Sequence, residues 1–208
     1  LRIVIFYLIF IPIPFVQASF IDTEAETAVI IDATTGKVLF EKEMNKKTYP
    51  ASMTKIMTTL IVFEKLSNGT LSLDDKFLVS EKAWREREGS SMFVEVDKEI
   101  RVEDLLRGII VQSGNDACIV IAENIAGSEE AFAIIMTSKA KEIGMLNTNF
   151  TNSTGMHSND NYSTVYDIAI LSQYLINEFP EYYHLFAETE FCLLHTSPSP
   201  RDSDTSRM

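Results

Sequence analysis

A serine and a lysine lie three residues apart in the stretch 49–57, which reads Tyr-Pro-Ala-Ser-Met-Thr-Lys-Ile-Met. Ser52 carries a hydroxyl that can act as a nucleophile, and Lys55 carries an amine that can remove its proton. Apolar residues recur at helical spacing from Met53 onward, and Pro50 is favoured where a helix begins, so both side chains are expected on one face of the first turn. Because a lysine is a good base near neutral pH only when its pKa is lowered, Lys55 must be buried or lie beside another cation.

The same spacing occurs a second time in the chain. Ser138 and Lys141 match it, but they lie inside an uninterrupted helical stretch, where a serine is an ordinary surface residue. Ser52 instead follows a proline at the start of a helix, and its alternative role is that of an N-cap. The spacing alone leaves both interpretations of Ser52 open.

Ser113 and Asn115 form a second polar motif, between two apolar helical stretches at 102–111 and 116–126. A helix connector in which Asn115 caps the next turn explains this motif as well as a functional role does. A serine nucleophile with a lysine base also needs a second hydroxyl to relay protons and an amide to hold the substrate. The two motifs together therefore indicate catalysis more specifically than either one alone.

The remaining sequence predicts the elements that would position these motifs. The pattern indicates two strands joined by a glycine-containing turn and several amphipathic helices separated by Gly, Asn and Ser. The expected elements are a hairpin over 27–42, helices over 53–68, 102–111, 116–126, 128–143 and 164–176, short strands at 77–79 and 91–96, and a long loop over 147–162.

Composition excludes several classes of function. The formal net charge of -12 argues against binding to nucleic acid, which requires a basic surface. His157, His184 and His195 lack the spacing of metal ligands, so no metal site and no cofactor are predicted. Cys118 lies in an apolar helical run and Cys192 in a polar tail, and no disulfide is expected between them.

The two ends differ in composition from the body. Residues 1–18 are mostly apolar and end in Val-Gln-Ala, which predicts a secretory signal peptide; the alternative, a membrane anchor, needs a longer apolar run. Residues 192–208 are rich in Ser, Pro and Asp, which predicts a disordered tail. Residues 19–191 would then be the exported body of the chain.

These motifs, in this order, resemble the D-alanyl-D-alanine carboxypeptidases of the low-molecular-mass penicillin-binding proteins. Ser-x-x-Lys with Ser-Asp-Asn and Lys-Thr-Gly is the motif set of the wider group. The resemblance covers 20–191 and is carried by 33–39, 50–55, 111–117, 150–157 and 162–183. It implies an α/β (α+β) penicillin-recognising serine hydrolase fold, with an antiparallel sheet and a helical lobe, incomplete at the C-terminus.

The resemblance also implies a role for each motif residue. Ser52 would attack the carbonyl between two D-alanines, Lys55 would take its proton, and Ser113 would pass a proton to the departing D-alanine. Asn115 would hydrogen-bond the substrate, and the backbone N–H of Ser52 would form half of an oxyanion hole. The implied partners are peptidoglycan pentapeptides and β-lactam antibiotics. The implied location is the periplasm or the outer face of the bacterial cytoplasmic membrane, with peripheral membrane association through a segment outside this chain.

The third motif of that family is absent, since no Lys-Thr-Gly occurs in the chain. The resemblance therefore implies that 19–191 is a partial transpeptidase-like catalytic domain, and that 192–208 is a frameshift or foreign sequence joined to a truncated gene. The hairpin would also lack its later strands, and a lone hairpin is marginally stable in water. We therefore expect the 208-residue chain to fold poorly or to be inactive. Two alternatives stay open, a β-lactamase of the same fold and a non-catalytic exported module that binds the cell wall. Against the first, the chain has Ser-Gly-Asn where Ser-Asp-Asn is expected, and it lacks a Glu-x-x-Leu-Asn pattern.

Overall fold

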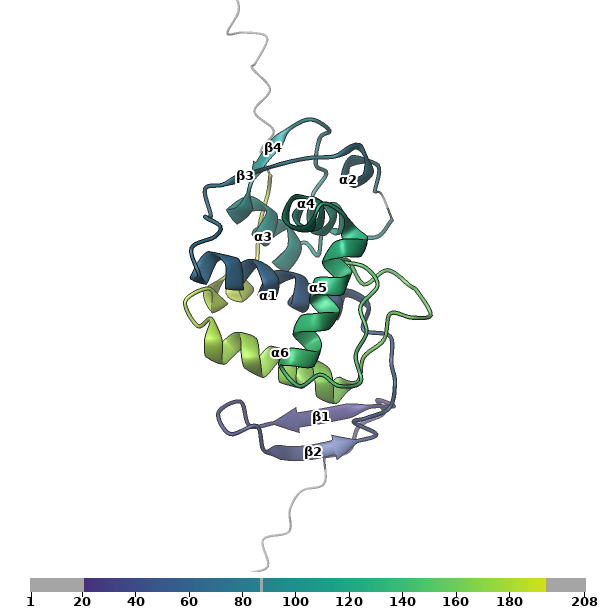
Figure 1. Cartoon of the computed structure of the whole chain (residues 1–208). Coiled ribbons are helices and arrows are strands. Elements are labelled where there is room, and N and C mark those ends of the chain that lie inside the picture. Colours follow the sequence, from purple (N-terminus) through teal and green to yellow (C-terminus); the bar gives the residue numbers. More distant parts are fainter. Residues whose placement is uncertain (1–20, 87, 194–208) are drawn as a thin grey trace, which may run out of the picture.

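The computed structural model describes residues 21–86 and 88–193, which form a helical body with a small antiparallel sheet at each end (Figure 1). The predicted signal peptide at 1–18 lies outside the described residues, as does all of the predicted tail except Cys192 and Leu193. Within the described ranges, no helix has the length and apolar character needed to cross a membrane.

The helices follow the pattern expected from the sequence. Gly127, with φ +82°, ends one helix, and the Ser128 and Thr164 hydroxyls cap the next two by accepting a hydrogen bond from a backbone N–H. The helices are α1 (Thr54–Ser67), α2 (Glu81–Arg85), α3 (Val102–Ile110), α4 (Asn115–Ala126), α5 (Glu129–Glu142) and α6 (Val165–Glu178), with 3-10 turns η1 (Ala51–Met53) and η2 (Tyr183–Ala187).

The predicted N-terminal hairpin is confirmed. Strands β1 (Ala28–Ile31) and β2 (Val38–Lys42) pair in antiparallel fashion, and Gly36 takes a positive φ of +70° in the connection. The hairpin lies beside α6 (Figure 1), because the Gln173 and Asn177 side chains on α6 both donate to the Ala33 carbonyl. This contact holds the hairpin against the helical body.

The core surrounds α1 and α4. Helix α1 contacts α3, α4, α5 and α6, while α4 also contacts α2 and α5. Buried apolar side chains fill the space between these helices, among them Met57, Leu60, Phe63, Leu105, Leu106, Ile121, Phe132 and Met136. The start of each of these two central helices is therefore held by packing on several sides.

The strand predicted at 91–96 is wrong. This segment has no strand, and Phe93 adopts a positive φ of +61°. The buried Asp116 carboxylate on α4 accepts hydrogen bonds from the backbone N–H groups of Met92 and Val94, at 3.0 and 3.1 Å. Those groups cannot also form a ladder. The strand lies a few residues later as β4 (Glu99–Arg101), which pairs with β3 (Lys76–Leu78).

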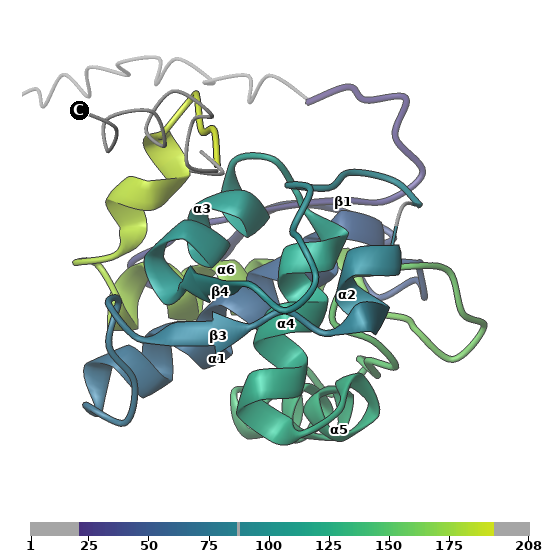
Figure 2. The same ribbon diagram turned by 90° about the horizontal axis from the view of Figure 1, so that it is seen from above.

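Residues after α6 turn back onto the body. Figure 2 shows η2 and the chain that follows it running beside α3. Arg107 on α3 forms an ion pair with Glu188 at 2.8 Å, and the Gln112 side chain donates to the Phe191 carbonyl at 2.7 Å. Phe63 on α1 also meets the rings of Tyr182 and Phe186. The segment after α6 therefore covers one side of the α1–α3 pair.

Candidate active site

Ser52 and Lys55 meet at the start of α1. Ser52 is exposed within η1, and the Lys55 Nζ atom donates to Ser52 Oγ at 3.3 Å. The prediction that the two side chains share one face is confirmed. Neither η1 nor α1 has a side-chain cap, so the alternative in which Ser52 is an N-cap is wrong. Ala51, just before the serine, has a positive φ of +48°, a strained backbone of the kind that clusters at active sites.

The environment of Lys55 favours its neutral form. The residue is only 6% exposed, and its Nζ donates to the Thr154 carbonyl at 2.8 Å. Burial lowers the pKa of the Lys55 amine, as the sequence required. The nearby Cys118 acts in the opposite direction when ionised. Burial raises the pKa of the Cys118 thiol to about 12, however, so the thiol carries no charge near neutral pH.

Ser113 faces the same pocket from another helix pair. It lies between α3 and α4 with a positive φ of +57°, whereas the neighbouring Gly114 has an ordinary φ of -62°. Ser52, Lys55 and Ser113 line one pocket of about 120 Å³, together with Ile56, Thr59, Ile109, Ile110 and Phe186. The structure therefore brings together three of the four predicted site residues. A hydroxyl, a buried amine and a second hydroxyl are the groups needed for acyl transfer with proton relay.

Asn115 lies close by but is held differently. It is the first residue of α4 and is 4% exposed, and its Nδ2 donates to the Glu88 carbonyl at 2.7 Å. The N-cap of α4 is Gly114 and no side chain caps the helix, so the interpretation of Asn115 as a cap is wrong. Asn115 is not among the residues that line the Ser52 pocket.

The loop 152–156 contributes contacts that sequence reasoning missed. The Thr154 carbonyl accepts from Lys55, and the Ser153 carbonyl accepts from the Thr58 hydroxyl at 2.7 Å, one turn further along α1. Gly155 has φ +86°, and a Cβ there would lie 1.8 Å from the Ala51 carbonyl oxygen. The only available signal was the glycine within the family-like stretch 150–157. These contacts hold the loop against the turn that carries Ser52.

The other side chains that could carry chemistry are the cysteines and the possible metal ligands. Cys118 is a buried free thiol and Cys192 an exposed one. Within residues 21–86 and 88–193, no group of three or more His, Cys, Asp or Glu side chains is arranged to hold a metal ion.

Comparison with known proteins identifies close similarity to one family. The sequence model of the family described as D-alanyl-D-alanine carboxypeptidase (peptidase S11) matches residues 15–199. The chain is 46% identical, over 153 residues, to the D-alanyl-D-alanine carboxypeptidase DacF of Bacillus subtilis; the match covers 74% of this chain and 39% of that protein.

Solved structures give the same result for the fold. The D-alanyl-D-alanine carboxypeptidase DacD from Francisella tularensis superposes with a TM-score of 0.79 at 40% identity, covering 81% of this chain and 40% of that one. Penicillin binding protein 5 from Haemophilus influenzae gives a TM-score of 0.79 at 35% identity, covering 81% and 50%. The predicted α/β fold with antiparallel sheets and a helical lobe is confirmed. The chain spans between about two fifths and half the length of these relatives.

Proposed function

Since the chain belongs to the D-alanyl-D-alanine carboxypeptidase family, we propose that the full-length gene product is a serine-type enzyme that removes the terminal D-alanine from peptidoglycan stem peptides. One observation carries this proposal: Ser52, Lys55 and Ser113 line one pocket, with the Lys55 amine 3.3 Å from the Ser52 hydroxyl. A nucleophile within reach of a buried base is the basic requirement for forming an acyl-enzyme.

The proposed reaction begins when Ser52 Oγ attacks the carbonyl carbon between the two D-alanines. Lys55 accepts the hydroxyl proton, because a neutral amine that donates to the Thr154 carbonyl still has its lone pair free. The peptide C–N bond then breaks, and Ser113 passes a proton to the departing D-alanine nitrogen. Asn115 hydrogen-bonds the substrate, and the Ser52 backbone N–H stabilises the developing oxyanion. Water finally hydrolyses the acyl-enzyme and frees Ser52.

The same chemistry predicts the partners and the location. β-Lactam antibiotics would acylate Ser52 in place of the peptide, in keeping with the similarity to a penicillin binding protein. Residues 1–18 would act as a signal peptide that exports a catalytic domain beginning at residue 19, to the periplasm or the outer face of the cytoplasmic membrane. Peripheral membrane association would depend on sequence outside this chain.

The proposal concerns the full-length protein because the 208 residues contain no Lys-Thr-Gly. In the proposed domain organisation, 19–191 is part of the catalytic domain and 192–208 is a non-native tail.

We expect the 208-residue chain to be inactive, since the motif that would bind the substrate carboxylate is missing. A cooperative melt of this chain together with D-alanine release from a pentapeptide mimic would contradict that expectation.

Fluorescent penicillin tests the nucleophile in the full-length protein. The wild type and the Ser138→Ala variant should both become labelled and should release D-alanine from a pentapeptide mimic, whereas Ser52→Ala should do neither. A label that persists in Ser52→Ala, or one that is lost in Ser138→Ala, would show that the assignment is wrong.

The two alternative functions predict different outcomes of the same experiment. A β-lactamase would hydrolyse the penicillin rapidly and keep little label, and a non-catalytic wall-binding module would not be labelled at all. Neither alternative is favoured, because the similar proteins are D-alanyl-D-alanine carboxypeptidases and the hydroxyl–amine pair is intact.

A further inference from the structure

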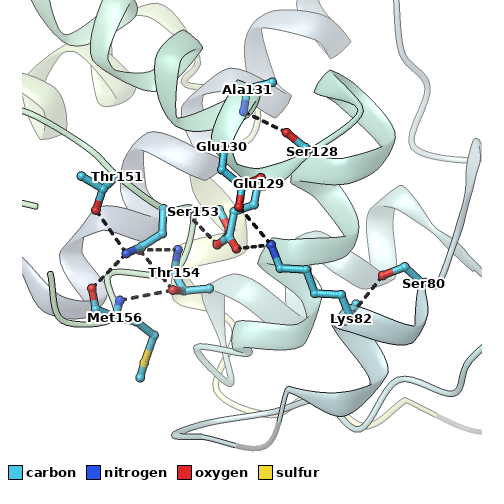
Figure 3. A network of polar contacts seen from close by, with 12 residues as sticks. Ser80, Lys82, Ser128, Glu129, Glu130, Ala131, Thr151, Ser153, Thr154 and Met156 are labelled. Carbon is cyan, nitrogen blue, oxygen red and sulfur yellow. Dashed lines mark hydrogen bonds and ion pairs between the residues drawn. The ribbon is translucent and has the colours of Figure 1, made fainter.

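Glu129, in the first turn of α5, has a carboxylate that is almost enclosed by protein. Its side chain is 12% exposed, and Oε1 accepts hydrogen bonds from both the backbone N–H and the hydroxyl of Ser153, at 3.1 and 2.8 Å. Oε2 lies 3.0 Å from the Lys82 Nζ atom on α2. Figure 3 shows this carboxylate between Lys82 on one side and Ser153 on the other. Glu129 therefore links α2, α5 and the loop 152–156.

Ser153 in turn contacts the helix that carries the reactive amine. Ser153 is fully buried, and its carbonyl accepts from the Thr58 hydroxyl at 2.7 Å. The next carbonyl along the chain, that of Thr154, accepts from Lys55 Nζ at 2.8 Å. Two consecutive peptide groups thus contact side chains one turn apart on α1. A displacement of Ser153 would necessarily move the carbonyl that orients the Lys55 amine.

The hydrogen bonds within the loop do not fix its position on the body. The Asn152 side chain accepts from the Gly155 N–H at 2.7 Å and from Thr154, which sets the shape of the turn. Without the Glu129 carboxylate, however, the buried N–H and hydroxyl of Ser153 would lose their acceptor. Leaving a buried donor unpaired is costly, so the loop would shift to find another acceptor or water.

Lys82 and Glu129 form an ion pair, with Nζ 3.0 Å from Oε2. Burial tends to lower the pKa of Lys82, but its hydrogen bond to Glu129 and the charges of Glu129 and Glu130 outweigh this and raise the pKa overall. Hydrogen bonds to an ionised acceptor are stronger than those to a neutral one. Lys82 and Ser153 therefore hold the Glu129 carboxylate from two sides.

We propose that Glu129 is a positioning residue for the reaction, and that it holds the Thr154 carbonyl against the Lys55 amine through Ser153. The inference rests on the proposed function of Ser52 and Lys55. An acidic residue in the first turn also stabilises a helix through its dipole, and Glu130 separates this effect from positioning. Glu130 lies in the same first turn and 3.6 Å from Lys82, but it is 76% exposed and has no hydrogen bond to the loop. It is the matched control.

The test measures how fast fluorescent penicillin acylates the full-length protein at increasing penicillin concentration. Glu129→Ala should lower the saturating rate by about tenfold or more, because misplacing a reacting group slows chemistry. The half-saturating concentration reports penicillin binding, and the labelled end-point reports the folded fraction. Both should change by less than about twofold, because a positioning role affects neither binding nor folding. Glu130→Ala should leave all three values unchanged, and Glu129→Gln, which keeps an acceptor oxygen, should recover most of the rate.

A purely structural role would give another pattern. In that case Glu129→Ala would reduce the labelled end-point and the melting temperature, while the protein that still folds would react at the wild-type rate; this outcome overturns the proposal. If Glu129→Ala does not fold, Glu129→Gln and Ser153→Ala carry the test, each with a smaller fall in the saturating rate and an unchanged end-point. An unchanged rate in both would also overturn the proposal.

An activity-free measurement separates this inference from the proposed function. The NMR signal of the Lys55 side chain should move in Glu129→Ala and stay in place in Glu130→Ala, whether or not the protein reacts with penicillin. If the wild type is never labelled, the proposed function fails. If the Lys55 signal is the same in the wild type and Glu129→Ala, the positioning role fails.

Discussion

Two serine–lysine pairs with the same spacing lie in very different surroundings. Ser52 and Lys55 stand at the start of α1, with the amine buried and 3.3 Å from the hydroxyl. Ser138 and Lys141 lie in the second half of α5, and both are exposed. Among the described residues, neither of these two exposed side chains has a hydrogen bond or an ion pair. The spacing places two residues on one helix face, but it does not make them react.

The difference comes from what covers each helix. The loop 152–156 covers the start of α1, where its Thr154 carbonyl takes a hydrogen bond from Lys55. Apolar side chains and Ser113 complete the enclosure of the pocket. At the other pair, Lys141 lies on the solvent side of α5 together with exposed residues such as Ile134. Tertiary contacts rather than spacing therefore distinguish the two pairs.

The largest predicted contrast is between the two lysines. Lys55→Met should lower the acylation rate of the full-length protein by about 10²- to 10⁴-fold, the usual contribution of a general base. Lys141→Met should leave the rate unchanged, because its amine contacts neither Ser52 nor the loop. Stopped-flow labelling with fluorescent penicillin measures both variants. Equal losses in the two variants would remove the distinction between the pairs.

A second contrast tests the loop itself. Gly155→Ala should destabilise the protein by roughly 2–5 kcal/mol, because a positive φ and the Ala51 carbonyl 1.8 Å from the new Cβ both oppose the side chain. Gly144 is the matched control: its φ is +96°, but a Cβ there would meet nothing within 4 Å. Gly144→Ala should therefore cost only about 1 kcal/mol, from backbone strain alone. Urea denaturation gives both values.

The rate of labelling sharpens this contrast. In Gly155→Ala the turn that carries Ser52 must move away from the loop, so acylation should slow even at temperatures where the variant is fully folded. Gly144→Ala should react at the wild-type rate. If Gly155→Ala reacts normally and is no less stable than Gly144→Ala, the loop does not hold the Ser52 turn.

The helices were predictable because their signals are local. The buried stripe of α3 and the glycine after α4 lie within the segments that they describe, and the structure follows them closely. The strand expected at 91–96 failed because a carboxylate more than twenty residues away, on Asp116, binds its backbone N–H groups. A period-2 pattern carries no information about such a partner.

In the candidate site, too, the local features were predictable from the sequence and the long-range contacts were not. Ser52 and Lys55 were found because they lie on one helical turn, and Ser113 because of its position between two apolar helices. The acceptor for the Lys55 amine could not be found, since Thr154 is 99 residues further along the chain and acts through a backbone carbonyl that any residue would provide. The left-handed backbone at Ser113 had no signal either, because Gly114 beside it is the residue that a left-handed position would favour.

A third contrast concerns pH. The pKa of Lys55 is lowered by burial, so between its folded-state value and the ordinary value of 10.5 the unfolded chain binds one more proton than the folded chain. The free energy of unfolding contributed by this group therefore rises with pH through that window. The wild type should gain stability relative to Lys55→Met as pH rises. Urea titrations between neutral and alkaline pH measure this difference in stability, and a difference that falls as pH rises would contradict the buried amine.

The smallest predicted effect is at Ser138. Serine has a lower helix propensity than alanine, and the exposed Ser138 hydroxyl has no hydrogen-bond partner among the described residues that could offset this. Ser138→Ala should therefore raise the free energy of unfolding by about 0.5 kcal/mol without changing the acylation rate. A loss of stability would mean that the Ser138 hydroxyl has a stabilising contact, like the one that Ser52 makes with Lys55. The two serines would then have similar environments, which would contradict the comparison. A small gain in stability with unchanged labelling would mean that, of the two Ser-x-x-Lys pairs, only the one at the start of α1 takes part in acylation.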